Sequence, residues 1–319
     1  MYGLYFIGMK HETLPKMNTI SKPATSVFTF PVLACLFGVY LIWGSTYLGI
    51  SWAIRGIPPF LMAGTRFVLA SLLVGGWCLY KKHPLPSKAQ WKNAFIMGLL
   101  MMVGGNGLVT VAEQWMPTGV AAVMIATVPL FALIFSHLHH RQKAHMLEWA
   151  GIVTGFTGIV LLNSDHALLA QPLGILMLLS AAASWAWGSV WSKNQDLLKG
   201  MMGSAAQMLA GGLMMVVLGL LRGERVTTMP DQHALLALAY LTLFGSILGY
   251  SAFVYLMNHV RPALATSYAY VNPIVAVSLG ALLNGEQVTL KMVLSMGIIL
   301  SAIFLVMLAQ KRQQAADAS

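Results

Sequence analysis

Long apolar runs follow one another along most of the chain, and polar segments of about a dozen residues or fewer separate them. A helix that crosses a bilayer needs about 20 consecutive, mostly apolar residues, and ten runs approach or exceed this length. We place the predicted spans at residues 31–53, 60–80, 94–112, 118–137, 147–163, 172–192, 200–221, 233–257, 262–283 and 290–309. The pattern predicts a polytopic membrane protein with no room between spans for a separate catalytic domain.

The apolar runs are continuous and do not alternate between apolar and polar residues. Lipid offers no hydrogen-bond partners, so a spanning segment must satisfy its backbone groups internally, as a helix does. The strands of a membrane β-barrel would instead alternate over about ten residues. We therefore expect an all-α fold with ten transmembrane helices.

Composition and charge agree with a membrane location. Hydrophobic residues make up 58% of the chain and charged residues 9%, whereas soluble domains have about 25% charged residues. The net charge of +10 could indicate a nucleic-acid partner, but with a cytoplasmic N-terminus 14 of the 19 Lys and Arg residues lie on the cytoplasmic side, 4 lie outside and Arg66 lies within a span. This is the positive-inside bias of membrane proteins. We expect an inner-membrane protein with both termini in the cytoplasm and no nucleic-acid partner.

Two terminal segments lie outside the spans. Residues 1–30 lack the features of a secretory signal and are expected to form a cytoplasmic N-terminal segment, and residues 310–319 a cytoplasmic tail. Met17 is an alternative start, so the translation of residues 1–16 stays open.

An internal repeat with an offset of 144 residues divides the chain. The tripeptide Trp-Gly-Ser at residues 43–45 recurs at residues 187–189, and further pairs match at nearly the same offset. The halves, residues 31–163 and 172–309, would each hold five spans, and because five is odd they would be inverted in the membrane. Inverted repeats build many secondary transporters, with the solute site between the halves near the midplane. Some channels are also built this way, so a channel remains an alternative.

Three motifs resemble those of the EamA-type branch of the drug/metabolite transporter superfamily. They are the sequence LIWGSTY at residues 41–47, Arg66-Phe67 in the second span, and ATSYAYVNP at residues 265–273. The resemblance covers about residues 31–310. It implies ten helices in two repeats and the export of small metabolites or drugs, without specifying the substrate.

Two prolines mark candidate helix breaks: Pro129 in the fourth span and Pro273 in the ninth, at the repeat offset. Proline removes a helical hydrogen bond and crowds the preceding turn. Paired breaks at matching positions point to a binding site, and static kinks are the alternative. Polar side chains near these breaks are expected to face protein or a cavity, because facing lipid is costly. The candidate substrate-binding residues are Trp43, Ser45, Thr46, Arg66, Asn106, Thr110, Thr127, Trp187, Ser189, Tyr250, Tyr268, Tyr270 and Asn272.

Arg66 is the one basic residue well inside a predicted span, and Glu113 ends the third span at a comparable depth. The two residues could pair as a structural contact or outer gate, with Glu113 as the gate candidate. Arg66 could instead recognise an anion or carboxylate, because ionisable residues in a membrane are functional candidates. No acidic residue lies at mid-membrane, which favours a facilitator or exchanger over a carboxylate proton relay, although coupling through Glu113 stays open.

No catalytic or cofactor-binding constellation is evident. His137, His139, His140 and His145 match no established metal-site spacing, and no Walker motif occurs. We expect no catalytic residues, no metal and no cofactor. The predicted function is transport, with a small-molecule substrate and the lipid bilayer as partners, in a monomer or homodimer. The family resemblance implies export of a metabolite such as an amino acid; multidrug export and a channel or loosely coupled facilitator are the alternatives.

Overall fold

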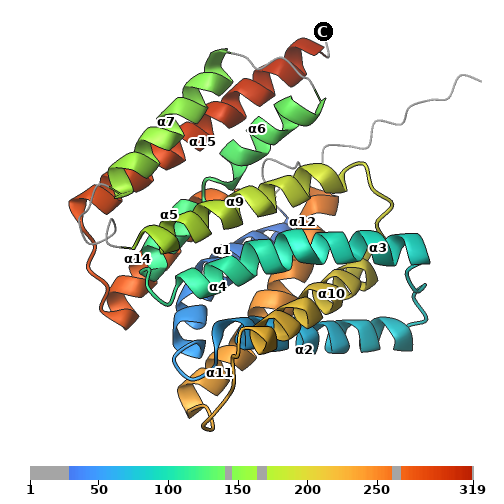
Figure 1. Cartoon of the computed structure of the whole chain (residues 1–319). Coiled ribbons are helices and arrows are strands. Elements are labelled where there is room, and N and C mark those ends of the chain that lie inside the picture. Colours follow the sequence, from blue (N-terminus) through green and yellow to red (C-terminus); the bar gives the residue numbers. More distant parts are fainter. Residues whose placement is uncertain (1–28, 141–145, 164–170, 261–266, 318–319) are drawn as a thin grey trace, which may run out of the picture.

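The computed structural model describes residues 29–140, 146–163, 171–260 and 267–317. Every regular element in these residues is a helix (Figure 1), so the predicted all-α fold is confirmed. The helices are α1 (Phe30–Ala53), α2 (Pro59–Tyr80), α3 (Lys88–Met97), η1 (Gly98–Gly107), α4 (Leu108–Ala112), α5 (Thr118–Ile125), α6 (Val128–His140), α7 (Met146–Asn163), α9 (Pro172–Ser192), α10 (Gly200–Leu221), α11 (Gln232–Tyr240), η2 (Leu241–Leu248), α12 (Gly249–His259), α14 (Tyr268–Asn284) and α15 (Leu290–Asp317).

Helical segments occupy each of the ten ranges expected from the apolar pattern. Within the described residues, seven helices are long and apolar enough to cross a membrane, and three shorter apolar helices cover Met146–Leu162, Val271–Asn284 and Leu290–Val306. Large apolar side chains such as Leu72, Val160 and Leu220 are exposed on the outside of the bundle, as a lipid-facing surface requires. The helices are therefore consistent with ten spans, while the span count and the inverted repeat stay predictions.

The helices pack in long pairs that surround a central group. Helix α2 lies along α10 and α7 along α15, and these two pairs occupy opposite sides of the molecule (Figure 1). Between them, α1 contacts α12 and α14, and α9 contacts η1, α4 and α6. Glycines permit the closest approach: a Cβ atom on Gly64 of α2 would lie 2.8 Å from the backbone nitrogen of Val216 on α10. Small residues at interfaces are how membrane helices pack tightly.

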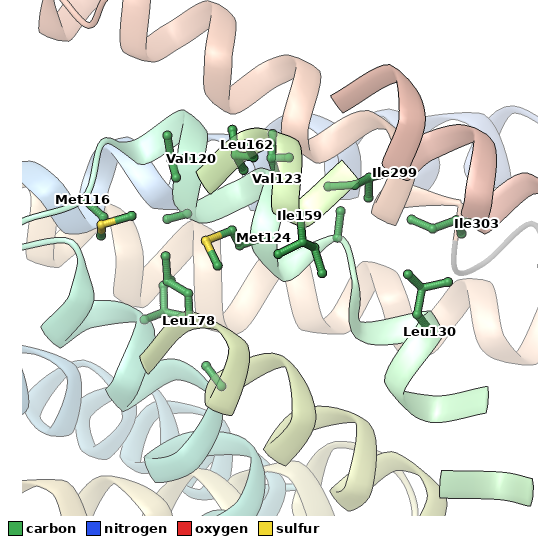
Figure 2. Packing of buried hydrophobic residues seen from close by; sticks show 14 of the residues in the cluster. Met116, Val120, Val123, Met124, Leu130, Ile159, Leu162, Leu178, Ile299 and Ile303 are labelled. Atoms are coloured by element: carbon green, nitrogen blue, oxygen red, sulfur yellow. The ribbon is translucent and has the colours of Figure 1, made fainter. Parts of the chain in front are cut away.

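A large cluster of buried apolar side chains joins the helices on one side of the bundle. Met124 of α5, Leu178 of α9, Ile159 of α7 and Ile299 of α15 belong to it (Figure 2). Met124, Leu178 and Ile299 are fully buried. This packing holds α5 and α9 against the α7–α15 pair, and α9 carries Trp187 and Ser189 of the candidate site.

The two candidate proline breaks differ. The fourth span is interrupted between α5 and α6, and Pro129 is the second residue of α6. The Thr127 hydroxyl donates to the carbonyl of Met124 at 2.6 Å within this interruption. Pro273, by contrast, lies inside α14, which runs continuously through it, so the expected break at Pro273 is not an interruption of the helix. Pro129 disturbs α6 little, because first-turn N–H groups have no helical acceptor. Pro273 lies past the first turn of α14, so it does remove a hydrogen bond within that helix.

Two π-helical segments were not anticipated from the pattern. Segment η1 interrupts the third span and η2 the eighth. The repeat offset of 144 maps residues 98–107 of η1 onto residues 242–251, which overlap η2. A π-turn closes its hydrogen bonds from residue i to i+5, and such turns are frequent at functional sites.

Candidate functional site

Trp43 of α1 lies against the second π-helical segment. Its indole Nε1 donates to the carbonyl of Gly245 at 3.1 Å. Its ring packs against Phe253 of α12, with centroids 5.3 Å apart, and meets Tyr268 of α14 edge-on at 4.8 Å. A Cβ atom on Gly249 would lie 2.5 Å from Nε1, so only glycine leaves room for this indole. Trp43 therefore joins α1, η2, α12 and α14.

Further predicted site residues extend this aromatic group. Tyr250 contacts Phe253, with ring centroids 6.5 Å apart. Asn272 is buried and, with its amide nitrogen facing the two carbonyls, donates to Tyr40 at 3.3 Å and Tyr268 at 3.1 Å. This amide ties α14 to α1. The Tyr270 side chain is outside the described part of the chain.

Trp187, the repeat partner of Trp43, belongs to a second aromatic group. Its ring meets Phe135 of α6 edge-on, with centroids 5.5 Å apart. Phe135 stacks on Phe131, and Phe131 meets Phe156 of α7 at 5.8 Å. The neighbouring Ser189 hydroxyl donates to the carbonyl of Trp185 one turn earlier, at 2.9 Å. Trp43 and Trp187, which match at the repeat offset in the sequence, thus belong to separate aromatic groups on α1 and α9.

The first π-helical segment contacts α9 much as the second contacts α1. The Ser184 hydroxyl of α9 donates to the carbonyl of Leu100 at 2.7 Å, as Trp43 does to a carbonyl of η2. A Cβ atom on Gly105 would lie 2.6 Å from Cε3 of Trp185. Asn106 donates to the carbonyl of Met101 at 3.2 Å. In both places a side chain from α1 or α9 donates to a π-segment carbonyl, and a glycine admits a tryptophan ring.

The other polar candidates on α1 and α4 hydrogen-bond to nearby groups. Ser45 donates to the carbonyl of Leu41 at 2.6 Å and lies 2.6 Å from the Tyr240 hydroxyl of α11. Thr46 donates to a carbonyl three residues earlier in α1 at 2.7 Å. Thr110 donates to a carbonyl four residues earlier at 2.8 Å. Ser45 is therefore the member of this group that links α1 to the eighth span.

Arg66 of α2 is buried and is held by the eighth span. Its Nε donates to the hydroxyl of Ser246 at 2.8 Å, and its guanidinium lies 4.8 Å from the centroid of the Phe67 ring. A Cβ atom on Gly245 would lie 2.9 Å from Nη2. The same glycine thus leaves room for Arg66 and supplies the carbonyl that accepts from Trp43.

Glu113 is buried, with 7% of its surface exposed, and neither carboxyl oxygen has a hydrogen-bond partner. Arg66 and Glu286 both act on it electrostatically, but no ion pair joins it to Arg66. Among the described residues, the one ion pair within 4.0 Å is between His137 and Glu148, at 3.4 Å. The direct Arg66–Glu113 contact considered from the sequence is therefore not formed in this structure.

A short motif repeats at the end of the bundle that the charge bias predicts to face outward; we call this the outer end. The sequence Leu-x-Gly-Glu closes α10 at residues 221–224 and α14 at residues 283–286. Gly223 and Gly285 adopt φ angles of 81° and 66°, a left-handed conformation that favours glycine. Each glycine reverses the chain and places a glutamate beside a helix of the first half.

The first of these glutamates, Glu224, accepts hydrogen bonds from the backbone N–H groups of Phe60 and Leu61 at 3.3 and 2.9 Å. These are free donors in the first turn of α2. A carboxylate is also favoured there by the helix dipole. Glu224 thus caps α2 from the loop that follows α10.

The second glutamate, Glu286, caps α5 in the same way. It accepts from the N–H groups of Thr118 and Gly119 at 2.9 and 3.2 Å. The Asn284 amide donates to Glu286 at 3.1 Å and accepts a hydrogen bond from Arg55 at the end of α1. The outer ends of α1, α5 and α14 are therefore joined through polar contacts, which we call the outer latch. Glu224 and Glu286 were missed from the sequence, although the repeated Gly-Glu pair after an apolar run was a usable signal.

Two adjoining cavities open at the outer end. One of about 530 Å³ is lined by the α1–α2 loop and the loop after α10. A smaller one of about 300 Å³ is lined by Ser51, Ile54, Arg55, Glu113 and Gln114. Ile54, Arg55 and Gln114 line both.

No group of three or more His, Cys, Asp or Glu side chains in the described residues is arranged to hold a metal ion. His145 and residues 1–28 of the N-terminal segment fall outside the described residues, and so do the side chains of His139 and His140. The interpretation of the histidine-rich segment therefore rests on its sequence alone.

A bundle of apolar helices with large apolar side chains on its outside is the architecture of an integral membrane protein. The model of the EamA-like transporter family matches residues 24–164 and 172–308, and the chain belongs to this family. It is a multi-pass transporter of the cell inner membrane, as the comparison with relatives indicates.

The relatives agree along nearly the whole length. The inner membrane transporter YedA of Escherichia coli strain K12 is 46% identical over 281 residues, covering 88% of this chain and 92% of YedA. The transporter YoaV of Bacillus subtilis is 27% identical over 86% of this chain and 96% of its own length. One solved crystal structure has a TM-score of 0.62 and 18% sequence identity, over 88% of this chain and 98% of that one. That likeness supports the fold alone.

Proposed function

We propose that the chain is a secondary transporter that exports a small metabolite, such as an amino acid or related compound, by alternating access. The solute site lies between α1, α9, η1 and η2, near the membrane midplane. The main support for this proposal is that the two π-helical segments make similar contacts, η2 with α1 and η1 with α9. On each side a π-segment carbonyl accepts from a side chain of α1 or α9, Gly245 from Trp43 and Leu100 from Ser184.

The interior between these helices suits a small organic solute. Ligand sites are mostly apolar and aromatic, with a few placed polar groups. Trp43 and Tyr268 supply aromatic surface, and Ser45 and Tyr240 supply hydroxyl groups. The remaining candidate residues keep the roles proposed from the sequence, as residues that line or support the proposed solute site: Thr46, Asn106, Thr110, Thr127, Ser189, Tyr250, Tyr270 and Asn272.

Alternating access follows from the inverted halves. If the same packing pattern occurs twice in opposite orientations, exchanging two slightly different conformations between the halves opens the opposite side. The outer latch of Arg55, Asn284 and Glu286 joins helices of both halves. These contacts support a conformation in which α1, α5 and α14 are held together at the outer end.

The energy source that the proposal favours is the gradient of the solute itself. Proton-coupled carriers often place an acidic residue or histidine at mid-membrane, and the predicted spans contain none there. Multidrug export remains the alternative within the same class, and a channel or loosely coupled facilitator the alternative of another kind.

A growth screen tests the proposal. The wild type, a Trp187→Ala variant and an empty vector are expressed in a sensitive bacterial host and challenged with toxic amino-acid analogues and with lipophilic cationic drugs. Trp77→Ala is the matched control, because Trp77 is an exposed residue of α2. Protection by the wild type and Trp77→Ala, but not Trp187→Ala, against one analogue class supports metabolite export. Protection against many unrelated cations supports the multidrug alternative.

Tracer counterflow in reconstituted vesicles separates a carrier from a channel. A carrier transiently accumulates labelled solute when unlabelled solute is loaded on the opposite side. A channel only equilibrates it, so equilibration without accumulation would contradict alternating access.

A further inference from the structure

Glu113 is a buried carboxyl group without hydrogen-bond partners, and the proposed midplane site does not account for it. Its side chain is more than nine-tenths buried, and both carboxyl oxygens lack a hydrogen-bond partner. Burying a carboxyl group without partners is costly, and each such group in a native structure requires an explanation. The explanation must come from what lies next to Glu113.

The neighbour of Glu113 is the smaller outer cavity of about 300 Å³. Its lining combines an acid, Glu113, with a base, Arg55, and with two neutral polar residues, Ser51 and Gln114. The volume lies at the lower end of the range for small-molecule sites, about 300–1,000 Å³. One cavity therefore has both an acid and a base in its lining, with the Glu113 carboxyl oxygens themselves covered in this structure.

Neither Arg55, which lines this cavity, nor Arg66, deeper in the bundle, forms an ion pair with Glu113. The Arg55 guanidinium donates to the Asn284 side-chain oxygen, and the same Asn284 amide donates to Ser51 at 3.3 Å. Arg66, deeper in the bundle, is held by Ser246 at 2.8 Å. Both guanidinium groups are thus positioned by neutral partners, and no ion pair within 4.0 Å joins either of them to Glu113 among the described residues.

We propose that this cavity is an outer binding site for a small amphoteric solute that carries both a cationic amino group and a carboxylate. On binding, the side chains that cover the Glu113 carboxyl move aside; Glu113 then receives the amino group and Arg55 the carboxylate, while Gln114 and Ser51 offer neutral hydrogen bonds. The inference rests on the proposed export function, in which the solute occupies this site after the midplane site and before its release outside. It differs from the midplane site, because it lies at the outer ends of α1 and α4.

The experiment compares solutes that share a carbon skeleton and differ in one charged group. Purified protein in lipid nanodiscs is titrated with L-leucine, with 4-methylpentanoate, which lacks the amino group, and with 3-methylbutylamine, which lacks the carboxylate. Alanine, propionate and ethylamine form a second, smaller set. Ligand binding raises the unfolding temperature, so the concentration dependence of this rise gives an apparent Kd for each solute.

The wild type is expected to bind at least one of the two amino acids. It should bind each matching single-charge analogue about tenfold to a hundredfold more weakly, as expected for loss of one charge-assisted hydrogen bond. Glu113→Gln should bind the amino acid no more tightly than the analogue that lacks the amino group. It should still bind the amino acid more tightly than the analogue that lacks the carboxylate. Arg55→Gln should lose the preference for the amino acid over the amine. The control is Glu148→Gln, because Glu148 is also a buried acid but pairs with His137; it should keep both preferences.

Three outcomes would overturn the inference. One is that neither amino acid binds the wild type. Another is that Glu113→Gln keeps its preference for the amino group, which would leave Glu113 as a proton site or structural residue. The third is that both variants weaken all solutes equally, as a general loss of structure would. The growth screen and counterflow assay measure transport independently, so the outer site can fail while the transporter proposal stands, and the reverse.

Discussion

The outer latch offers the sharpest test of how the two halves move. Glu286 accepts hydrogen bonds from Thr118 and Gly119 in the first turn of α5, at 2.9 and 3.2 Å, and from the Asn284 amide at 3.1 Å. The substitution Glu286→Gln keeps the shape of the side chain. It removes the negative charge and one of the two accepting oxygens.

The expected energy change follows from these contacts. Hydrogen bonds to a charged group contribute about 1.5–3 kcal/mol and neutral ones about 0.5–1.5 kcal/mol, and a carboxylate also gains about 0.3–1 kcal/mol from the helix dipole. Replacing the carboxylate by an amide should therefore weaken the latch by about 1–2 kcal/mol. A change of this size shifts a two-state equilibrium about 5–30-fold. The population with an open outer end should increase by this factor.

Thiol labelling measures that population. Thr118 is 1% exposed and its hydroxyl has no partner, so Thr118→Cys is a mild reporter that only an opened outer end exposes. In a background with Cys35 and Cys78 replaced by alanine, Glu286→Gln should raise the labelling rate by a membrane-impermeant maleimide added outside about 5–30-fold.

A matched variant gives the control. Glu224→Gln breaks the corresponding cap on α2, which packs along α10 away from α5, and it should leave the labelling rate unchanged. Equal labelling with and without Glu286 would refute the idea that this carboxylate holds the outer end closed. An equal rise for both variants would instead indicate general loosening of the bundle.

Four further predictions follow from the interior. Arg66→Ala should abolish transport while the protein still inserts, because the guanidinium joins α2 to the eighth span; normal export by a well-expressed variant would remove Arg66 from the mechanism. Gly249→Ala should displace the Trp43 indole, since its Cβ would lie 2.5 Å from Nε1. Its effect on transport should vanish in a Trp43→Ala background, and additive losses would argue against the contact. Gly64→Ala should destabilise the protein by about 1–3 kcal/mol through overpacking against α10, measured by thermal unfolding in detergent. Gly76→Ala on the same helix should not, because no atom lies within 4 Å of its added Cβ; equal effects would contradict the packing argument. Export in vesicles should persist without a pH gradient, and loss of all net flux on its collapse would refute solute-driven transport.

The helical spans could be predicted from the sequence because lipid imposes one strong rule, a long apolar helix for each crossing. The repeat that pairs Trp43 with Trp187 can also be read from the sequence, and the role of the two residues in a solute site stays a prediction. The interruption between α5 and α6 was expected, because Pro129 has no backbone N–H to donate to a helical hydrogen bond. At Pro273 the helix α14 continues without an interruption, which agrees with the static kink considered as the alternative. One residue type does not determine whether the surrounding helices hold a proline-containing turn in place.

Contacts between distant segments could not be predicted. Arg66 bonds to Ser246, 180 residues away, and the amphipathic pattern carries no information about which neutral group a buried cation will find. Depth alone suggested Glu113 as its partner, but similar depth does not bring two side chains together. The π-segments were hidden for a related reason: their turns depend on what packs against them, such as the Trp185 ring beside Gly105, and not on local preference alone.

The π-segments have a geometric consequence for how a spanning helix can move. Successive residues of an α-helix are rotated by about 100°, since a turn holds 3.6 residues, and a π-turn holds more residues than an α-turn. If the wide turn shifts by one position along the helix, the residues it passes rotate relative to the rest, while both ends of the helix keep their places. A shift of the wide turn within η1 or η2 would therefore rotate one face of that helix while the loops at its two ends stay in place.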